Sequence, residues 1–254
     1  MTPSTISRKL VRVLLPAAFW LGVWQLAAAQ VGKQLLLPTP AAVLLTLGRL
    51  LGTAVFWQTA GASLLRIFTG FVAGVAAGAA LALLTSFSRW AEVLLAPAVR
   101  VVRATPVASF IILVLLWVKT GQVPGVISAL MVLPVVWSSL SAGLKATDPL
   151  LLELASAYGF GRGKTVRLVY APSALPYFAS GCDTALGLAW KAGIAAEVLC
   201  LPKAAVGTQV YYSKIYLETP SLFAWTLVVV VMSLLLERGL GAAVRKLGKA
   251  GAAR

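Results

Sequence analysis

The chain has 254 residues, of which 60% are hydrophobic and only 11% are charged, and its mean hydropathy is +0.92. Soluble domains carry about a quarter charged residues, so this composition excludes a soluble protein and predicts an all-α integral membrane protein. The sequence contains no histidine, which excludes metal binding through imidazole and His-based catalysis. We therefore expect neither a metal site nor a cofactor.

The net charge of +15 is compatible with two kinds of partner. Binding to nucleic acid would need the basic residues on one folded face, whereas here the Lys and Arg residues cluster between apolar runs. That distribution is typical of the positive-inside rule for membrane proteins. We predict that the chain lies in the lipid bilayer and binds no nucleic acid.

The first apolar run, residues 13–29, follows three basic residues and ends in the small-residue stretch Ala-Ala-Ala-Gln. This profile suits either a retained first helix or a cleaved signal peptide. Because the run is longer than a usual signal-peptide core and more apolar runs follow, we favour a retained helix. The less apolar segment 38–61 has leucines at helical spacing and is predicted to lie at the membrane surface.

We predict six membrane spans in a single transmembrane domain over residues 1–254. They lie at about residues 13–29, 63–85, 102–118, 123–144, 174–198 and 221–236. The second span contains Gly70, Gly74 and Gly78, which would form a smooth stripe that lets a neighbouring backbone approach closely. The alternative is that glycine is simply common in membrane helices.

The basic residues predict the orientation of the chain. If both termini are cytoplasmic, fifteen Lys and Arg residues lie on the cytoplasmic side and six lie outside, with Lys191 inside the membrane. This asymmetry favours cytoplasmic termini and an even number of spans. The polar interruption at residues 145–173 is then cytoplasmic, and the stretch 200–220 is external.

The interruption contains the sequence Gly-Phe-Gly-Arg-Gly-Lys-Thr at residues 159–165. A phosphate-binding loop has the form G-x-x-x-x-G-K-[ST] and follows a buried strand. Here Tyr158 occupies the position of the first glycine, and the preceding residues have a helical pattern. We therefore predict that this chain does not bind ATP itself.

The same interruption contains the signals of a short helix. Asp148 can cap its start, Pro149 suits its first turn, and Gly159 can end it in a left-handed conformation. A second short helical stretch at residues 164–169 would stop before Pro172. The alternative is an ordinary connection, but a loop of this length is more often functional.

At these residues the sequence resembles a known family. Glu153-Leu154-Ala155, then Gly159, then Val169-Tyr170-Ala171-Pro172 are similar to the EAA loop of binding-protein-dependent ABC importer permeases, EAA-x3-G-x9-I-x-L-P. Leu154, Val169 and Ala171 depart from that pattern but keep its apolar character. Segments 63–71, 103–110 and 187–197 resemble the branch that handles nitrate, sulfonates, taurine and thiamine precursors.

The resemblance implies a type I importer permease with a MetI-like fold and a coupling helix that inserts into a separate ATPase subunit. It assigns Glu153 to stabilise the loop by pairing with Arg162 or Arg167. The residues expected at the coupling site are Glu153, Ala155, Tyr158, Gly159, Phe160, Lys164, Arg167 and Pro172. Of these, Lys164 and Arg167 are equally compatible with plain positive-inside residues.

The resemblance also implies the partners and the location. They are two ATPase subunits, a second copy of the permease in a homodimer, and an extracytoplasmic solute-binding protein. The protein would lie in the bacterial cell (inner) membrane and would not be an enzyme. Its function would be to pass a small anionic or heterocyclic solute.

The fifth predicted span carries the residues expected to face the translocation path. Asp183, Gly187 and Lys191 are spaced four residues apart and share one helix face. Because ionisable groups are costly in lipid, this face should point inward. Lys191 would meet an anionic solute or, alternatively, be neutralised by an acidic residue or backbone carbonyls.

The external stretch 200–220 is the predicted docking surface for the binding protein. The residues expected to form it are Lys203, Tyr211, Tyr212 and Lys214. A secondary transporter driven by an ion gradient is the alternative function, but it would need charged or broken helices in inverted repeats. A membrane-embedded enzyme is a further alternative, and it lacks a convincing catalytic set.

Overall fold

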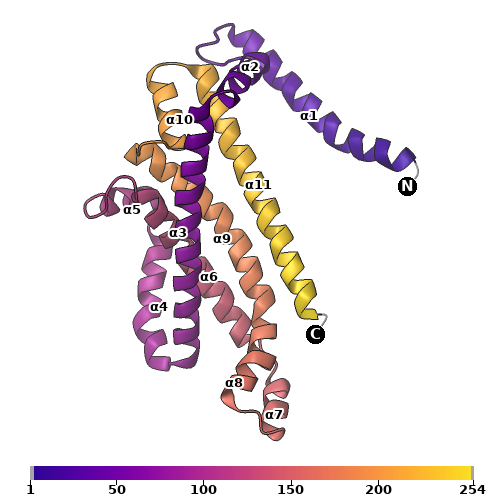
Figure 1. Ribbon diagram of the computed structural model, residues 1–254, viewed down its shortest axis with the longest axis vertical. Helices are drawn as coiled ribbons and strands as arrows, with labels where there is room; N and C mark the ends of the chain where they lie inside the picture. The colour runs from indigo at the N-terminus through magenta and orange to yellow at the C-terminus, as the bar shows by residue number, and fades with distance from the viewer. Residues whose placement is uncertain (1–2, 253–254) are drawn as a thin grey trace.

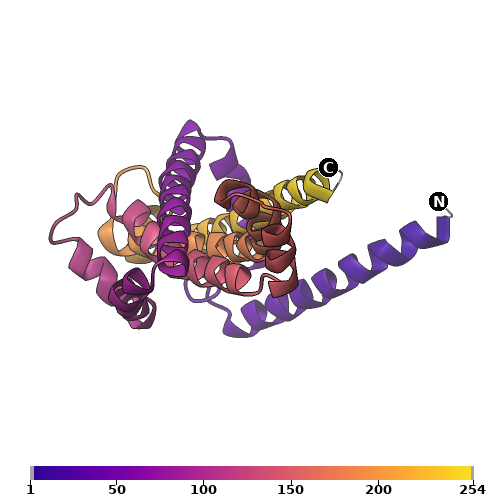
Figure 2. The same ribbon diagram turned by 90° about the horizontal axis from the view of Figure 1, so that it is seen from below.

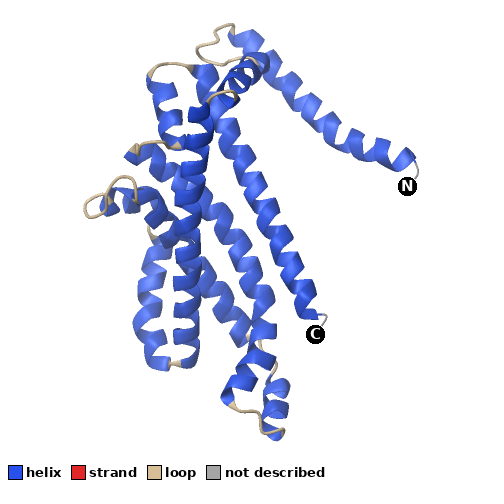
Figure 3. Cartoon of the chain, viewed as in Figure 1, coloured by secondary structure: helices blue, strands red, loops and turns tan. Residues whose placement is uncertain are grey.

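The computed structural model describes residues 3–252, and it describes side chains from residue 14 to residue 239. All regular elements of this part of the chain are helical (Figures 1 and 3). They are α1 (Pro3–Val31), α2 (Pro40–Leu51), α3 (Ala54–Phe87), α4 (Arg89–Ala104), α5 (Val107–Val114), α6 (Val123–Lys145), α7 (Pro149–Ala157), α8 (Arg162–Thr165), the π-helix η1 (Val166–Tyr170), α9 (Ala171–Cys200), α10 (Val206–Ile215) and α11 (Thr219–Ala252).

Four of the described helices are long and apolar enough to cross a membrane. They include the stretches Leu14–Val31, Ala54–Phe87, Val123–Lys145 and Thr219–Gly239. The pair α4 and α5 meets the same test only when taken together. Helix α9 has 30 residues but is less apolar, because it contains Asp183, Lys191 and Glu197.

The predicted span at residues 102–118 is not one helix. Helices α4 and α5 meet at a bend of 105°. Thr105 has an extended backbone (φ −79°, ψ 132°), the conformation that a following proline enforces, and Pro106 has no N–H to continue the helix. The predicted bounds therefore cover the end of α4, the bend and α5 rather than one continuous helix.

The predicted surface helix at residues 38–61 is also shorter than expected. Helix α2 ends at Leu51, and α3 already begins at Ala54. Each start has its own cap: the hydroxyl of Thr39 accepts from the N–H of Ala42, and that of Thr53 accepts from the N–H of Phe56, both at 3.3 Å. The second predicted span, which began at residue 63, is therefore lengthened by about two and a half turns at its start.

Helices α3 and α6 run in the same direction and pack closely along the glycine stripe. A Cβ added to Gly70 would overlap the backbone of Gly125. A Cβ at Gly74 would lie 2.6 Å from the carbonyl oxygen of Ala129, and one at Gly78 would lie 2.7 Å from that of Leu133. The predicted close approach at the stripe is confirmed, since no other residue type fits at these distances.

Helix α9 lies in the middle of the bundle, in contact with α3, α6, α10 and α11. Its Trp190 is buried and donates from Nε1 to the carbonyl oxygen of Val229 in α11 at 3.0 Å. About one turn earlier in α11, Trp225 stacks on Phe56 of α3 with ring centroids 5.3 Å apart. These contacts tie α11 to the bundle. One face of α9, which includes Asp183, Leu188 and Lys191, stays uncovered.

Helix α1 leans away from the bundle in both views (Figures 1 and 2). Among its described side chains, Trp24 contacts the bundle: it donates from Nε1 to the carbonyl oxygen of Pro38 at 3.1 Å and stacks on Phe223 of α11. Most of its apolar side chains from Leu14 onward are exposed in the single chain.

Candidate functional site

The knob, which we define as residues 148–170, projects from one end of the bundle (Figure 1). The carboxylate of Asp148 accepts from the N–H of Leu150 at 2.9 Å and starts α7, with Pro149 in the first turn. Gly159 has φ +65°, and the N–H of Phe160 donates to the carbonyl oxygen of Ala155 at 2.8 Å. The predicted start and end signals of this helix are confirmed.

The exposed face of α7 differs from the predicted contact surface. Tyr158 is 75% exposed, but Ala155 is only 4% exposed because it faces the rest of the knob. Leu150 and Leu154, which the motif did not single out, are exposed instead. Their signal was the spacing of four residues that places them and Tyr158 on one helix face.

Glu153 does not have the predicted partner. Its side chain is exposed, and the two ion pairs of the described residues join Arg66 to Glu197 and Lys145 to Glu92. Neither Arg162 nor Arg167 pairs with it in this chain. The predicted internal ion pair is not formed: Glu153, Arg162 and Arg167 are all exposed, and exposed pairs contribute little to stability.

The second half of the knob joins the bundle without a break. Helix α8 continues through the π-helix η1 into α9, and Pro172 is the second residue of α9, directly after the π-helical turn. The prediction that a helix stops before Pro172 was wrong for this reason. Lys164, Arg167 and Gly159 are exposed, and Phe160 is half-buried.

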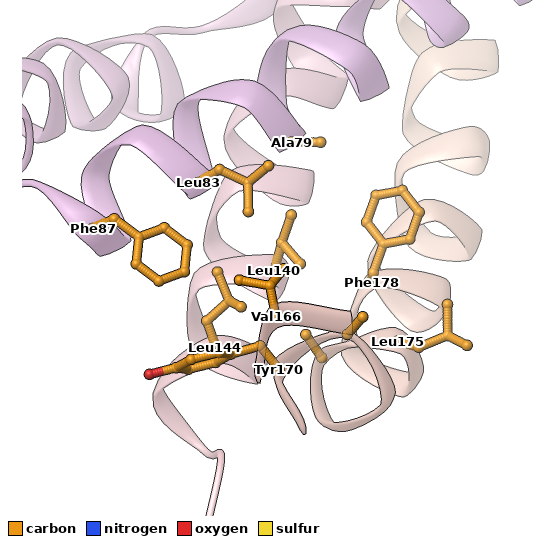
Figure 4. A pocket seen from close by; sticks show the side chains of 11 residues that line it. Ala79, Leu83, Phe87, Leu140, Leu144, Val166, Tyr170, Leu175 and Phe178 are labelled. Atoms are coloured by element: carbon orange, nitrogen blue, oxygen red, sulfur yellow. The ribbon is translucent and has the colours of Figure 1, made fainter. Parts of the chain in front are cut away.

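An apolar cavity of about 240 Å³ lies where the knob meets the bundle (Figure 4). It is lined by Ala79, Leu83, Phe87, Leu140, Leu144, Val166, Tyr170, Ala171, Ala174, Leu175 and Phe178. The ring of Tyr170 meets Phe87 edge to face, with centroids 5.7 Å apart. Side chains of α3, α6, η1 and α9 therefore meet at this level of the bundle.

The predicted path residues share the uncovered face of α9. Asp183 and Lys191 are exposed in the single chain, and Gly187 is partly buried. Glu237 of α11 lies beside Gly187, since a Cβ there would be 3.1 Å from its Oε1. No acidic residue of the described side chains pairs with Lys191, so this face presents unpaired ionisable groups.

The predicted docking residues gather at the end of the bundle opposite the knob (Figure 1). Lys203 precedes α10, and Tyr211, Tyr212 and Lys214 lie on it. Both lysines and Tyr212 are exposed, and Tyr212 stacks on Tyr216 with centroids 6.0 Å apart. The structure therefore places these residues on α10 and just before it, at the same end of the bundle.

The buried carboxylate of Glu197 was not assigned any role from the sequence. It is 0% exposed, and its Oε1 accepts from Nη1 of Arg66 at 2.7 Å. Its Oε2 accepts from the hydroxyl of Ser63 at 2.8 Å and from the N–H of Gly207 at 3.0 Å. A usable signal was present: a charged residue inside one predicted span and an arginine inside another.

Ionisable side chains on one face of a central membrane helix are a mark of membrane transport proteins. Residues 70–249 match the family model described as "Binding-protein-dependent transport system inner membrane component", and the chain belongs to this family. It is a permease of the binding-protein-dependent ABC importers, as predicted from the EAA-like loop. The described residues contain no group of three or more metal-ligating side chains.

Several relatives are similar over most of the chain. The taurine transport system permease protein TauC of Escherichia coli is 29% identical, with 88% of this chain and 83% of the relative covered. The putative aliphatic sulfonates transport permease protein SsuC of Bacillus subtilis is 27% identical, with coverage of 93% and 86%. A probable ABC transporter permease of Haemophilus influenzae is 30% identical, with coverage of 90% and 93%.

Solved structures share the fold. A chain of an amino acid ABC transporter superposes with a TM-score of 0.59 at 17% identity, covering 74% of this chain and 90% of the other. A chain of the MetNI methionine transporter in an inward-facing conformation also gives 0.59, at 19% identity, with coverage of 75% and 93%. The predicted MetI-like fold is confirmed.

Proposed function

We propose that this chain is the membrane subunit of an importer that moves a small anionic solute into the cell. An extracytoplasmic binding protein delivers the solute, and a separate ATPase subunit, present in two copies, supplies the energy. The observation that carries the proposal is the exposed apolar face of the knob, formed by Leu150, Leu154 and Tyr158. Such a helix face outside the membrane fits a groove on a partner protein.

The knob faces the cytoplasm in this proposal, together with both termini. The basic residues on that side support this orientation. The surface around α10 then lies outside, where Lys203, Lys214 and Tyr212 can meet the binding protein. The knob continues through η1 into α9, so movement of the ATPase subunit reaches the helix that carries the path residues.

A second copy of the chain completes the path. Asp183 and Lys191 are exposed on α9, and leaving ionisable groups against lipid is costly. A homodimer with this face at its centre would place both groups along a shared polar path. Helix α1, which has few contacts with its own bundle, provides further apolar surface for the partner or the lipid.

The solute is of the sulfonate type in this proposal. The support is Lys191 on the path face together with the similarity to permeases named for taurine and aliphatic sulfonates. The ligand that co-purifies with the importer's binding protein, identified by mass spectrometry, tests this class. A neutral heterocyclic ligand would contradict the solute class without affecting the permease role.

Uptake into vesicles tests the energy source. With the binding protein present, we expect solute accumulation only when the ATPase subunit and ATP are both supplied. Uptake that continues without the ATPase subunit would overturn the proposal. If an imposed ion gradient drove that uptake, the chain would be a secondary transporter.

Replacing Tyr158 by aspartate is expected to weaken binding of the ATPase subunit. Tyr158 is 75% exposed, and an aromatic anchor at an interface contributes about 2 kcal/mol or more. Co-purification with the ATPase subunit and the rate of uptake measure the effect. Tyr216→Asp is the matched control for co-purification, since Tyr216 is 70% exposed but lies at the opposite end of the bundle. Equal ATPase binding by the two variants would contradict the docking role of the knob.

Replacing Lys191 by methionine is expected to raise KM for an anionic solute about tenfold, because one charge-assisted contact is lost. Methionine keeps the length of the side chain, so the helix and its packing should be preserved. The KM of uptake with saturating binding protein is the measurement, and Lys191→Arg should restore it. Lys119→Met, at another exposed lysine, is the control. An unchanged KM in Lys191→Met would remove Lys191 from the path.

A further inference from the structure

Helix α10 has no cap within its own sequence. Its N-cap residue is Ala205, whose side chain cannot accept a hydrogen bond. The first N–H groups of the helix are instead bound by residues of two other helices. The N–H of Val206 donates to the hydroxyl of Ser63 in α3 at 2.9 Å, and that of Gly207 donates to Oε2 of Glu197 in α9 at 3.0 Å.

The carboxylate of Glu197 suits this position electrostatically. A helix N-terminus carries a partial positive charge and free N–H groups, so a nearby anion stabilises it. The negative charge is also balanced, because Arg66 of α3 donates from Nη1 to Oε1 at 2.7 Å. Arg66 further donates from Nη2 to the carbonyl oxygen of Lys203 at 3.4 Å, which joins the segment before α10 to the same group.

Glycine at position 207 is required by this arrangement. A Cβ there would lie 2.5 Å from Cβ of Glu197, 2.7 Å from the backbone nitrogen of Val198 and 2.8 Å from the carbonyl oxygen of Ile194. Helix α10 therefore begins in direct contact with the backbone of α9. Real Cβ atoms do not approach other atoms this closely, so only glycine allows the contact.

The segment between α9 and α10 also needs an external support. Leu201 and Ala204 have positive φ angles of 52° and 46°, a left-handed conformation that costs free energy for residues other than glycine. The hydrogen bonds from Arg66 to the carbonyl of Lys203 and from Val206 to Ser63 flank Ala204. They can hold the backbone in this conformation.

We infer that Glu197, together with Ser63, is a positioning residue that caps α10 from outside its own sequence and fixes the binding-protein docking surface to the path helix α9. This inference rests on the proposed function, because it takes α10 as the docking surface. Helix α9 runs unbroken from Ala171 to Cys200, from the knob to the residue three positions beyond Glu197. Docking on α10 therefore acts on the path and the knob through one rigid element.

Hydrogen exchange measured by mass spectrometry tests the cap directly. The complex of permease and ATPase is placed in bilayer nanodiscs, and wild type is compared with Glu197→Gln. We expect exchange in residues 206–210 to rise about tenfold or more, since a charged acceptor at the helix start is lost. Unchanged exchange there would overturn the cap. Ser63→Ala removes the other acceptor and leaves the charge of Glu197 in place. It should also raise exchange in residues 206–210, and it keeps the test usable if Glu197→Gln fails to fold.

Stimulation of ATP hydrolysis by the loaded binding protein tests the consequence. We expect Glu197→Gln and Ser63→Ala to raise the binding-protein concentration for half-maximal stimulation about tenfold, because a loosened α10 presents its contact residues less often. The rate without binding protein, measured in the same nanodiscs, is the reference. Glu92→Gln is the matched control, because its ion pair with Lys145 is exposed and lies far from α10 in sequence. It should leave both readouts at the wild-type value.

The outcomes separate this inference from the proposed function. Faster exchange at residues 206–210 with an unchanged half-maximal concentration would overturn the role of α10 in docking while keeping the cap. A wild-type complex that no binding protein stimulates would overturn the proposed function itself. A general rise of exchange across α3 and α9 would overturn the specific role, since it would mean loss of the fold.

Discussion

Replacing Gly70 by leucine is expected to destabilise the protein by about 3 kcal/mol or more, as overpacking of a tight interface does. A single Cβ at this position already overlaps the carbonyl group of Gly125 in α6. Backbone cannot move aside as a flexible side chain can, so α3 and α6 must separate. That separation would also disturb Gly74 and Gly78, which contact the same helix one and two turns further along.

Gly61→Leu is the matched control for this prediction. Gly61 lies in the same helix α3, but nothing lies within 4 Å of a Cβ added there. Both substitutions gain the same helix propensity, so any difference between them reports packing alone. Thermal unfolding in detergent, followed by the midpoint temperature, measures it. Equal midpoints for Gly70→Leu and Gly61→Leu would show that the stripe does not set the distance between α3 and α6.

The α3–α6 contact shows which part of the fold could be predicted from sequence. The spacing of Gly70, Gly74 and Gly78 identified a smooth helix face, because spacing along one helix is local information. The choice of α6 as the partner, and the parallel direction of the pair, is not local. It depends on how all the helices share the available space, so only the structure supplies it.

The knob could be predicted more fully for the same reason. Asp148, Pro149 and Gly159 act on their immediate neighbours, and all three occupy the expected cap positions. The exposure of Leu154 and the burial of Ala155 depend on how α7 packs on η1, which the motif does not encode. The partner of Glu153 was predicted from the family resemblance and from opposite charge, and neither fixes which exposed side chains meet.

The network around Glu197 was missed because its partners are far apart in the sequence. Ser63 and Arg66 lie 134 and 131 residues from Glu197. A hydropathy profile registers each of these residues only as a local loss of apolar character within a span. Reading the charged residues of two spans together, as groups that must find partners inside the bundle, would have indicated the pair.

Replacing Arg66 by alanine is expected to cost about 3–5 kcal/mol, since it leaves the buried carboxylate of Glu197 without its counter-charge. Glu197 is 0% exposed, and the side chain of Arg66 is only 18% exposed, so the pair lies largely out of contact with solvent. The hydrogen bonds from Ser63 and Gly207 would remain, but neither donor carries a charge. Thermal unfolding of the purified protein measures the loss.

Two further variants distinguish the effect of the Arg66–Glu197 ion pair from the effects of its two side chains taken singly. Lys145→Ala breaks the other ion pair, whose side chains are 66% and 45% exposed, and should cost about 0–1 kcal/mol, as exposed pairs do. Adding Glu197→Gln to Arg66→Ala removes the unpaired charge and should recover part of the stability lost in Arg66→Ala alone. Two results would show that Arg66 and Glu197 do not depend on each other. In the first, the stability losses of Arg66→Ala and Glu197→Gln simply add in the double variant. In the second, Arg66→Ala costs no more than Lys145→Ala. Recovery in the double variant would mean that the positive charge of Arg66 keeps Glu197 ionised, so that its carboxylate can accept from the first N–H groups of α10. The ion pair would then connect the stability of α3 to the order of the external surface.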